Sequence, residues 1–264
     1  MTVPWPGTTS REDTVADVFV LLPPSETKAV GGEGAPLDLG SLRFPGLEGP
    51  RTVLIDALTA VCAEVPLART ALSVGVGKDP EIAATAGLRD AATLPALRRY
   101  TGVLYVALDV ARLPKAALER AENRLLITSA LFGVVAGGDA LPAYRLSAGS
   151  VLPGLPRLPA FWRPHLAEQL RRLDHPVLDL RSSAYAGFAP LPGAITVRIL
   201  TEDAAGRRTV VSHTNKATKG RLARALVLTR AELTGVAAVV RVAVRAGLRA
   251  ERTGERSLDV ITAS

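Results

Sequence analysis

Two residues just after a double proline, Glu26 and Lys28, have the types that acid/base chemistry requires. Pro23-Pro24 fixes the local φ angles and so holds the segment that presents both side chains. A carboxylate and an ammonium two residues apart can act as an acid/base couple or form an ion pair. The alternative is that Ser25-Glu26 only stabilises the turn.

A tyrosine and an arginine, Tyr144-Arg145, follow a Gly-Gly-Asp-Ala-Leu-Pro loop after a strongly apolar run. Side chains in such a position are supported rigidly and can be aimed into a crevice. An arginine there can hold a phosphate or carboxylate by two hydrogen bonds, while the tyrosine offers a hydroxyl. An internal ion pair from Arg145 to Asp139 or another carboxylate is an equally good interpretation.

Ser182, Ser183 and Tyr185 come directly after a short apolar segment that is expected to be a strand. Hydroxyl groups at a strand end are typical of an active site. Serine capping of the next helix explains Ser182 or Ser183 without any function, and this is the better interpretation.

Basic residues gather at the start of an expected helix near the end of the chain, namely Lys216, Lys219, Arg221 and Arg224. Lysines at a helix start oppose the helix dipole, and a ligand with negative charge makes that arrangement more tolerable. We therefore favour anion binding by Lys216 and Lys219, with His213 beside them, over a merely solvated helical face.

The segment LSVGVGKDPEIA at 72–83 places a Gly-Val-Gly-Lys turn between two expected helices. Gly75 and Gly77 let backbone N–H groups approach phosphate oxygens, and Lys78 adds a positive charge. A plain glycine turn between helices is the alternative. The segment lacks the full phosphate-loop pattern, so nucleotide hydrolysis here is not expected.

No cofactor or metal site is expected. His165, His175 and His213 are far apart in the sequence, and no cysteine or carboxylate spacing joins them. Motifs of serine hydrolases, zinc proteases and dinucleotide-binding enzymes are missing, so no named catalytic class is predicted. Cys62, the single cysteine, lies in an apolar helical run and fits a reducing cytosol.

Composition favours a polyanionic partner. The formal net charge is +7, from 32 Lys and Arg against 25 Asp and Glu. A GC-rich coding sequence would give the same Arg-rich, Ala-rich composition without any function. No apolar stretch of about 18 residues and no signal-peptide pattern occur. We expect a cytoplasmic protein with no membrane partner and no obligate protein partner.

The elements that must position these residues alternate between helix and strand. Residues 1–16 predict a flexible leader, and 17–264 a single α/β domain with a central mixed sheet flanked by helices. Residues 30–50 predict a glycine-rich loop, for which a lid is one role and a plain surface loop the better one. Strands are expected at 18–22, 125–135, 177–180, 194–201, 208–214, 239–244 and 258–261, and helices at 52–65, 80–90, 95–110, 114–124, 161–173 and 216–230.

Several motifs in order resemble the YaaA (peroxide stress protein) family, in the branch with a PPSETK motif. They are LLPPSETK at 21–28, YTG at 100–102, LITSALFGVVAGGDALPAYRL at 126–146, FW at 161–162, LDLRSSAY at 178–185 and SHTNKATKGRLAR at 212–224. In the best-known branch, a lysine falls at the position of Glu26. The same branch has YAKKARG where this chain has TNKATKG, which keeps Lys216 and Gly220.

The resemblance implies a single α/β domain with a basic cleft and a helix-hairpin-helix-like element. It also implies binding of double-stranded DNA and a role in limiting iron-driven damage under hydrogen peroxide stress. Our leading hypothesis is non-specific DNA binding by the 75–78 turn and a cleft lined by Lys28, Arg145, Lys216 and Lys219. The alternative is an enzyme acting on a small anionic or nucleotide-like molecule in the same cleft.

Overall fold

The computed structural model describes residues 18–210 and 212–263, without the side chains of 212–214. Its main sheet has eight strands in the order β4-β3-β1-β6-β7-β10-β9, with β8 added beside β7. The strands are β1 (Phe19–Leu22), β3 (Leu125–Ser129), β4 (Gly133–Ala136), β6 (Val177–Asp179), β7 (Ile195–Glu202), β8 (Arg208–Thr209), β9 (Arg249–Gly254) and β10 (Ser257–Ala263). A separate pair joins β2 (Leu94–Pro95) to β5 (Ala140–Leu141).

The five inner strands, β3, β1, β6, β7 and β10, run parallel, whereas β4, β8 and β9 are antiparallel additions. The expected mixed sheet flanked by helices is therefore confirmed. From β1 the chain places β3 on one side and β6 on the other, so the sheet order reverses at β1. A crevice opens at such a reversal, outside the carboxyl ends of the strands, and ligands commonly bind there.

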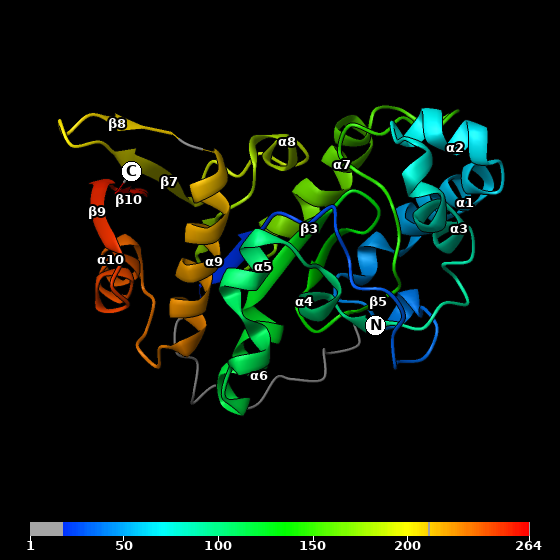
Figure 1. The fold of residues 1–264 in the computed structure, drawn as a ribbon. Helices are drawn as coiled ribbons and strands as arrows, with labels where there is room; N and C mark the ends of the chain where they lie inside the picture. The colour runs from blue at the N-terminus through cyan, green and yellow to red at the C-terminus, as the bar shows by residue number, and fades with distance from the viewer. Residues whose placement is uncertain (1–17, 211, 264) are drawn as a thin grey trace.

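Ten α-helices within the described residues surround the sheet. They are α1 (Glu48–Cys62), α2 (Val65–Leu72), α3 (Asp79–Ala86), α4 (Ala96–Arg99), α5 (Val103–Leu108), α6 (Lys115–Arg124), α7 (Leu158–Arg171), α8 (Ser183–Ala186), α9 (Ser212–Leu228) and α10 (Val236–Arg245). In Figure 1, α5 and α9 stand side by side in front of the sheet, and α1, α2 and α3 form a group at one end. None of the described helices is long and apolar enough to cross a bilayer.

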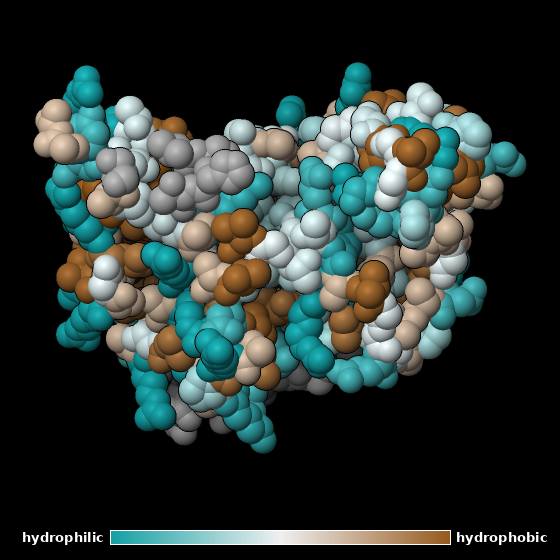
Figure 2. All heavy atoms as spheres, in the orientation of Figure 1, coloured by the Kyte–Doolittle hydropathy of each residue, from teal (hydrophilic) through white to brown (hydrophobic). Residues whose placement is uncertain are grey.

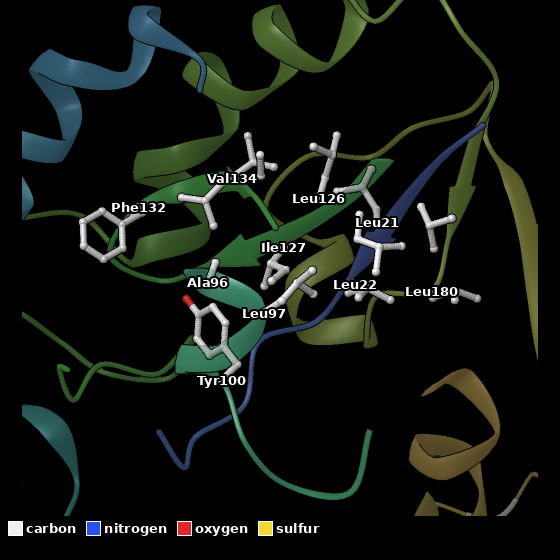
Figure 3. Packing of buried hydrophobic residues seen from close by; sticks show 14 of the residues in the cluster. Leu21, Leu22, Ala96, Leu97, Tyr100, Leu126, Ile127, Phe132, Val134 and Leu180 are labelled. Atoms are coloured by element: carbon white, nitrogen blue, oxygen red, sulfur yellow. The ribbon is translucent and has the colours of Figure 1, made fainter. Parts of the chain in front are cut away.

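Strands β1, β3 and β4 are buried along their whole length, as near-continuous apolar strands covered on both faces should be. Figure 3 shows Leu21 and Leu22 of β1 beside Leu126 and Ile127 of β3 in this core. Leu97 and Tyr100 extend from α4 into the same region. The core thus fixes the strand ends that lead into the polar loops.

The expected single strand at 125–135 is wrong, because the segment forms two antiparallel strands, β3 and β4. Gly133 makes the reversal possible with a φ of 73°, and a Cβ atom there would lie 2.7 Å from the Trp162 ring. Both strands are fully buried, so the apolar run gives no polar residue to mark the turn.

The expected strand at 239–244 is also wrong, because these residues belong to helix α10. Val236, Val239 and Val242 recur at three-residue spacing and face the core, while Arg241 and Val244 are exposed. Tertiary packing of this amphipathic face outweighs the strand preference of β-branched residues. Strand β9, which follows α10, was not predicted.

The expected glycine-rich loop at 30–50 carries two short 3-10 helices, and its last residues begin α1. Arg99 donates to the carbonyls of Ala29 and Gly31, and Gly34 pairs with Thr93. The start of the loop is therefore fastened to the body of the protein. The expected helix at 95–110 is divided into α4 and α5, with Gly102 between them at a φ of 99°.

The remaining expected elements are confirmed with shifted ends, including β1, β6, the β7–β8 hairpin, and helices α1, α3, α6, α7 and α9. In the hairpin, the second strand is shorter than expected, because α9 begins at Ser212. The expected leader at 1–16 lies outside the described residues.

Candidate functional site

The carboxyl ends of β1 and β3 bring together groups from segments far apart in the sequence. Lys28 lies a few residues beyond β1 and forms a strand-like bridge with Tyr100, which ends α4. Ser129 is the last residue of β3, and Tyr144 and Arg145 follow β5. These five residues, together with Glu26 and Glu81, are called the Lys28 cluster below.

The Lys28 ammonium lies against aromatic rings and backbone carbonyls. Its Nζ atom is 4.2 Å from the ring centre of Tyr144 and 5.5 Å from that of Tyr100. It donates to the carbonyl oxygens of Ser25 at 3.2 Å and Glu26 at 3.4 Å. Lys28 as a whole residue is half-buried.

The pKa of Lys28 is lowered from 10.5 to about 7, mainly by burial and next by the nearby Arg145 guanidinium. Glu81 and Glu26 act in the opposite direction, and Arg99 adds to the lowering. A pKa near 7 means that the charged and the uncharged forms of the amine are both present at neutral pH. An uncharged lysine amine can accept a proton or attack an electrophile, which an ammonium cannot.

A chain of buried hydroxyl groups lies beside the amine. Tyr144 Oη is 2.7 Å from Tyr100 Oη and 2.7 Å from Ser129 Oγ. Ser129 Oγ accepts from the N–H groups of Leu131 and Phe132, so its own proton is available to Tyr144. Burial raises the pKa of Tyr100 to about 12, and the pKa of Tyr144 well above its usual value. These phenols therefore remain protonated near neutral pH.

Arg145 forms a bridge between two carboxylates. Its Nη2 lies 3.0 Å from Glu26 Oε2, and its Nη1 lies 3.3 Å from Glu81 Oε2. The Arg145 side chain is only 13% exposed, whereas that of Glu26 is 71% exposed. The expected internal ion pair of Arg145 is therefore formed, but with other carboxylates than Asp139, which accepts from the backbone N–H groups of Arg43 and Ala136.

Tyr185 lies within electrostatic reach of Tyr100, Glu26 and Arg145, and burial raises its pKa above the usual value. It therefore borders the Lys28 cluster. Ser182 occupies the cap position of α8, but its side chain makes no capping hydrogen bond. Ser182 and Ser183 are both exposed at the carboxyl end of β6.

The basic residues of α9 divide into internal and external ones. Lys219 donates to the carbonyl of Arg181 at 3.1 Å, and burial lowers the pKa of its ammonium. Arg224 binds the carbonyls of Leu108 and Asp109. Lys216 and Arg221 are exposed, and no contact links either of them to Lys28 among the described residues. The side chain of His213 is outside that part of the chain.

Arg221 lines an open groove of about 840 Å³ between α9 and the end of β10. The acidic residues Glu202 and Asp203 line the same groove, together with Arg249. On the face drawn in Figure 2, the surface is also notched between the part that carries α8 and the part that carries α2 and α3.

The Gly75–Lys78 segment does form a turn between two helices, α2 and α3. Gly75 has a φ of −87°, and a Cβ atom on either glycine would meet no atom within 4 Å. The Lys78 ammonium lies 2.6 Å from Glu81, and the first turn of α3 carries Asp79, which pairs with Arg69. Carboxylates thus already occupy the positive end of α3.

Three members of the cluster were not predicted as site residues, namely Tyr100, Ser129 and Glu81. Tyr100 and Ser129 fall within the motifs YTG and LITSALFG, but neither motif marks which of its polar residues belongs to a site. Glu81 follows the glycine turn and looks like an ordinary helix-start carboxylate. Glu81 is recognised as a member of the Lys28 cluster only from its pairing with Arg145, 64 residues away in the sequence.

Within the described residues, no group of three or more His, Cys, Asp or Glu side chains is arranged to hold a metal ion. His165 packs against the rings of Phe161 and Trp162, and His175 lies near Phe19 and Asp174. Both histidines have their own local contacts, away from the Lys28 cluster.

The fold and the cluster together define an α/β protein with a desolvated lysine at the carboxyl edge of a mostly parallel sheet. Residues 18–245 match the family described as peroxide stress protein YaaA, and the chain belongs to that family. It is 45% identical over 238 residues to a UPF0246 protein of Corynebacterium efficiens, covering 89% of this chain and 95% of the relative. It is also 46% identical over 228 residues to a UPF0246 protein of Streptomyces coelicolor, covering 84% and 88% respectively.

Proposed function

We propose that this protein binds and converts a small anionic molecule at the Lys28 cluster, as its part in the peroxide stress response. The observation that carries the proposal is the juxtaposition of Lys28 with Arg145 and the buried hydroxyls of Tyr100, Tyr144 and Ser129. An anion-binding guanidinium and an amine that titrates near neutral pH are together typical of a reaction site.

The surroundings of Lys28 suit a small molecule better than a duplex. Its amine lies among aromatic rings and backbone carbonyls, and the Arg145 side chain is mostly covered. Binding to the phosphates of a duplex instead favours a broad row of exposed cations. The Lys28 cluster therefore favours the enzyme hypothesis over DNA contact at the same residues.

Thermal unfolding in the presence of phosphate, simple carboxylates and nucleotides tests the proposal. At least one class should raise the Tm of the wild type, because a ligand that binds only the folded state stabilises it. The rise should be lost in Lys28→Met and in Arg145→Met. Lys115→Met, at an exposed position on α6, is the matched control and should respond as the wild type does. A rise that persists in both cluster variants would place the binding elsewhere.

Non-specific binding of double-stranded DNA is a second candidate function. It is supported by the net charge of +7 and by the exposed Lys216 and Arg221 of α9. The turn between α2 and α3 is a further candidate contact, in the manner of a helix-hairpin-helix element. Lys219 is less suited to this role, because its ammonium binds the Arg181 carbonyl.

Fluorescence anisotropy of a labelled duplex across a salt series tests the DNA candidate. We expect the slope of log affinity against log salt to fall by about 2 in the Lys216→Ala, Arg221→Ala double variant. The control pair Arg112→Ala, Lys115→Ala removes two exposed cations from the α5–α6 region instead. Absence of binding at low salt would remove this candidate and leave the Lys28 proposal intact.

Limitation of iron-driven damage is part of the same proposal. The family description supports a role under peroxide stress. A strain that lacks the gene should show more oxidative DNA lesions under hydrogen peroxide, and an iron chelator should remove the difference. Complementation with Lys28→Met should fail if the Lys28 cluster provides the protection, whereas complementation with Lys115→Met should succeed.

A further inference from the structure

The Lys28 amine has the surroundings of a nucleophile. An uncharged amine carries two N–H bonds and one lone pair. The carbonyls of Ser25 and Glu26 both accept hydrogen bonds from Nζ, so both N–H bonds have partners. The lone pair is then the one bonding position of the amine that these two carbonyls do not use, and it lies beside the rings of Tyr144 and Tyr100. Desolvation beside a second cation is one established way of activating a lysine for attack on a carbonyl group.

Glu26 occupies the place that a substrate carboxylate would take. Arg145 holds two carboxylates, and the two differ in freedom. Glu81 belongs to helix α3, whereas Glu26 lies on the loop after β1 and has a side chain that is 71% exposed. A ligand carboxylate could replace the Glu26 carboxylate and keep Arg145 paired. Because the Glu26 side chain is mostly exposed, its release to solvent would expose little additional surface. Because the Arg145 guanidinium and the Glu26 carboxylate both act electrostatically on the Lys28 amine, a ligand held at Arg145 would lie near that amine.

We propose that Lys28 forms an imine with the carbonyl group of a small 2-oxo acid, whose carboxylate replaces Glu26 at Arg145. This inference rests on the proposed function and names its substrate class. The charged and titratable groups that face the amine are Arg145, Glu81, Glu26, Arg99, Tyr100 and Tyr144.

The step balances without any oxidant, reductant or co-reactant. The nitrogen lone pair adds to the carbonyl carbon, and one of the two amine protons passes to the carbonyl oxygen to give a carbinolamine. The hydroxyl of the carbinolamine then leaves with the remaining nitrogen proton as water. One C=N bond replaces one C=O bond, and water is the only by-product.

Reductive trapping of the full-length protein tests the inference, with pyruvate as the probe and cyanoborohydride as the reductant. Peptide mass spectrometry should find the carboxyethyl adduct on Lys28. Near neutral pH we expect Lys28 to be labelled at least about tenfold faster than Lys115, because the free-amine fraction of an ordinary lysine is very small. Labelling of Lys28 no faster than Lys115 would overturn the inference.

The role of Arg145 is tested by comparing pyruvate with formaldehyde, which has a carbonyl group but no carboxylate. In Arg145→Met, the ratio of pyruvate to formaldehyde labelling at Lys28 should fall about tenfold to a hundredfold, the range expected for loss of charged hydrogen bonds. An unchanged ratio would overturn the assignment of the carboxylate to Arg145. If Arg145→Met fails to fold, Glu26→Gln serves instead, and should raise pyruvate labelling because it frees Arg145.

Lactate separates failure of this inference from failure of the proposed function. Lactate has the carboxylate of pyruvate but no carbonyl group. A rise in Tm with lactate that requires Arg145, together with no pyruvate adduct, would retain the small-anion site and overturn the imine. No rise with lactate or pyruvate and no adduct would overturn the imine and remove small carboxylates from the proposed function.

Discussion

Lys28 owes its proposed chemistry to its neighbours. A lysine two residues after a glutamate would form an ordinary surface ion pair in an open loop. Here Glu26 pairs with Arg145, and the Lys28 amine is left among rings and carbonyls. Burial and Arg145 together disfavour its charged form, so the pKa falls to about 7. The fold thus converts a common residue type into a group that titrates near neutral pH.

The lowered pKa of Lys28 predicts a specific pH dependence of stability. The amine is protonated in the unfolded chain up to about pH 10.5, but in the folded protein only up to about 7. Between these values the unfolded state binds more protons, so this group makes the free energy of unfolding rise with pH. Below pH 7 its full destabilising effect remains.

Urea unfolding of wild type and Lys28→Met at pH 6 and pH 9 measures this effect. The stability of Lys28→Met relative to the wild type should be greater at pH 6 than at pH 9. The control, Lys115→Met, should show the same difference from the wild type at both values. Equal differences for Lys28→Met at the two pH values would show that its amine titrates as an ordinary lysine does.

Cys62 has the surroundings of an inert thiol. Burial raises the pKa of its thiol to about 11, and the residue is the single cysteine of the chain. The thiolate is the form that hydrogen peroxide oxidises, so oxidation of the native protein should be slow. Mass spectrometry after peroxide treatment should find Cys62 unmodified in the folded protein and oxidised in urea. Rapid sulfenic acid formation in the folded protein would contradict this.

The candidate site could be predicted in part from the sequence. Glu26, Lys28, Tyr144, Arg145 and Tyr185 were named, because each follows a strand or a rigid turn. Their pairing was not predictable, since Glu26 and Arg145 are 119 residues apart. The choice of Glu81 over Asp139 as the partner of Arg145 depends on three-dimensional position alone.

At the scale of elements, buried arginines join segments that hydrophobic packing alone would leave unspecified. Arg51 of α1 is completely buried and donates to the carbonyls of Phe44, Phe132 and Val134, as well as Arg43. It thereby ties α1 to the β3–β4 hairpin. Composition alone favoured a polyanionic partner for the basic residues. Arg51 and Arg99 are instead buried and bind backbone carbonyl groups inside the protein.

Replacement of Arg51 should therefore be strongly destabilising. Arg51→Met removes the donor to four backbone carbonyl groups. Three of the four lost hydrogen bonds are buried. We expect a loss of about 3 kcal/mol or more in the free energy of unfolding, measured by urea denaturation. Arg112→Met, at a side chain that is 84% exposed, is the control and should change stability by less than about 0.5 kcal/mol. Similar losses of stability in Arg51→Met and Arg112→Met would contradict the idea that Arg51 ties α1 to the β3–β4 hairpin.

The close approach of α5 and α9 depends on Gly220. A Cβ atom at this position would lie 2.2 Å from the backbone oxygen of Leu104. Gly220→Ala should lower the free energy of unfolding by roughly 1–3 kcal/mol, because the helices must separate. Gly49 in α1 has open space around it, so Gly49→Ala meets no such clash and should change the free energy of unfolding by less than about 1 kcal/mol. Thermal melts of the two variants check this difference.

Periodicity predicted most of the elements but could not resolve two of them. In α10, the β-branched valines are typical of a strand, but their three-residue spacing puts them on one face of a helix. In β3 and β4, a continuous apolar run hides the turn at Gly133, because both strands are covered. In each case, packing against segments distant in the sequence decides between strand and helix or turn. For the turn at Gly133, one such segment is α7 with Trp162.

On the scale of the whole molecule, the reversal of sheet order at β1 locates the site. Parallel strands on both sides of β1 end at one edge, where the loop beyond β1 supplies Lys28 and the end of β3 supplies Ser129. Arg221 of α9 lines a different groove, together with Glu202 and Asp203. The proposed small-anion site and the candidate DNA contact at Arg221 can therefore be tested by separate variants.

The central claim is that the Lys28 amine titrates near neutral pH and responds to a small anion bound at Arg145. An NMR pH titration of protein isotopically labelled at the lysine ε-carbons tests it directly. We predict a midpoint near 7 for the resonance that disappears in Lys28→Arg, and an upward shift of that midpoint when lactate binds, because a nearby anion favours the ammonium. A midpoint near the ordinary value of 10.5 for Lys28, with no response to lactate, phosphate or nucleotides, would contradict it.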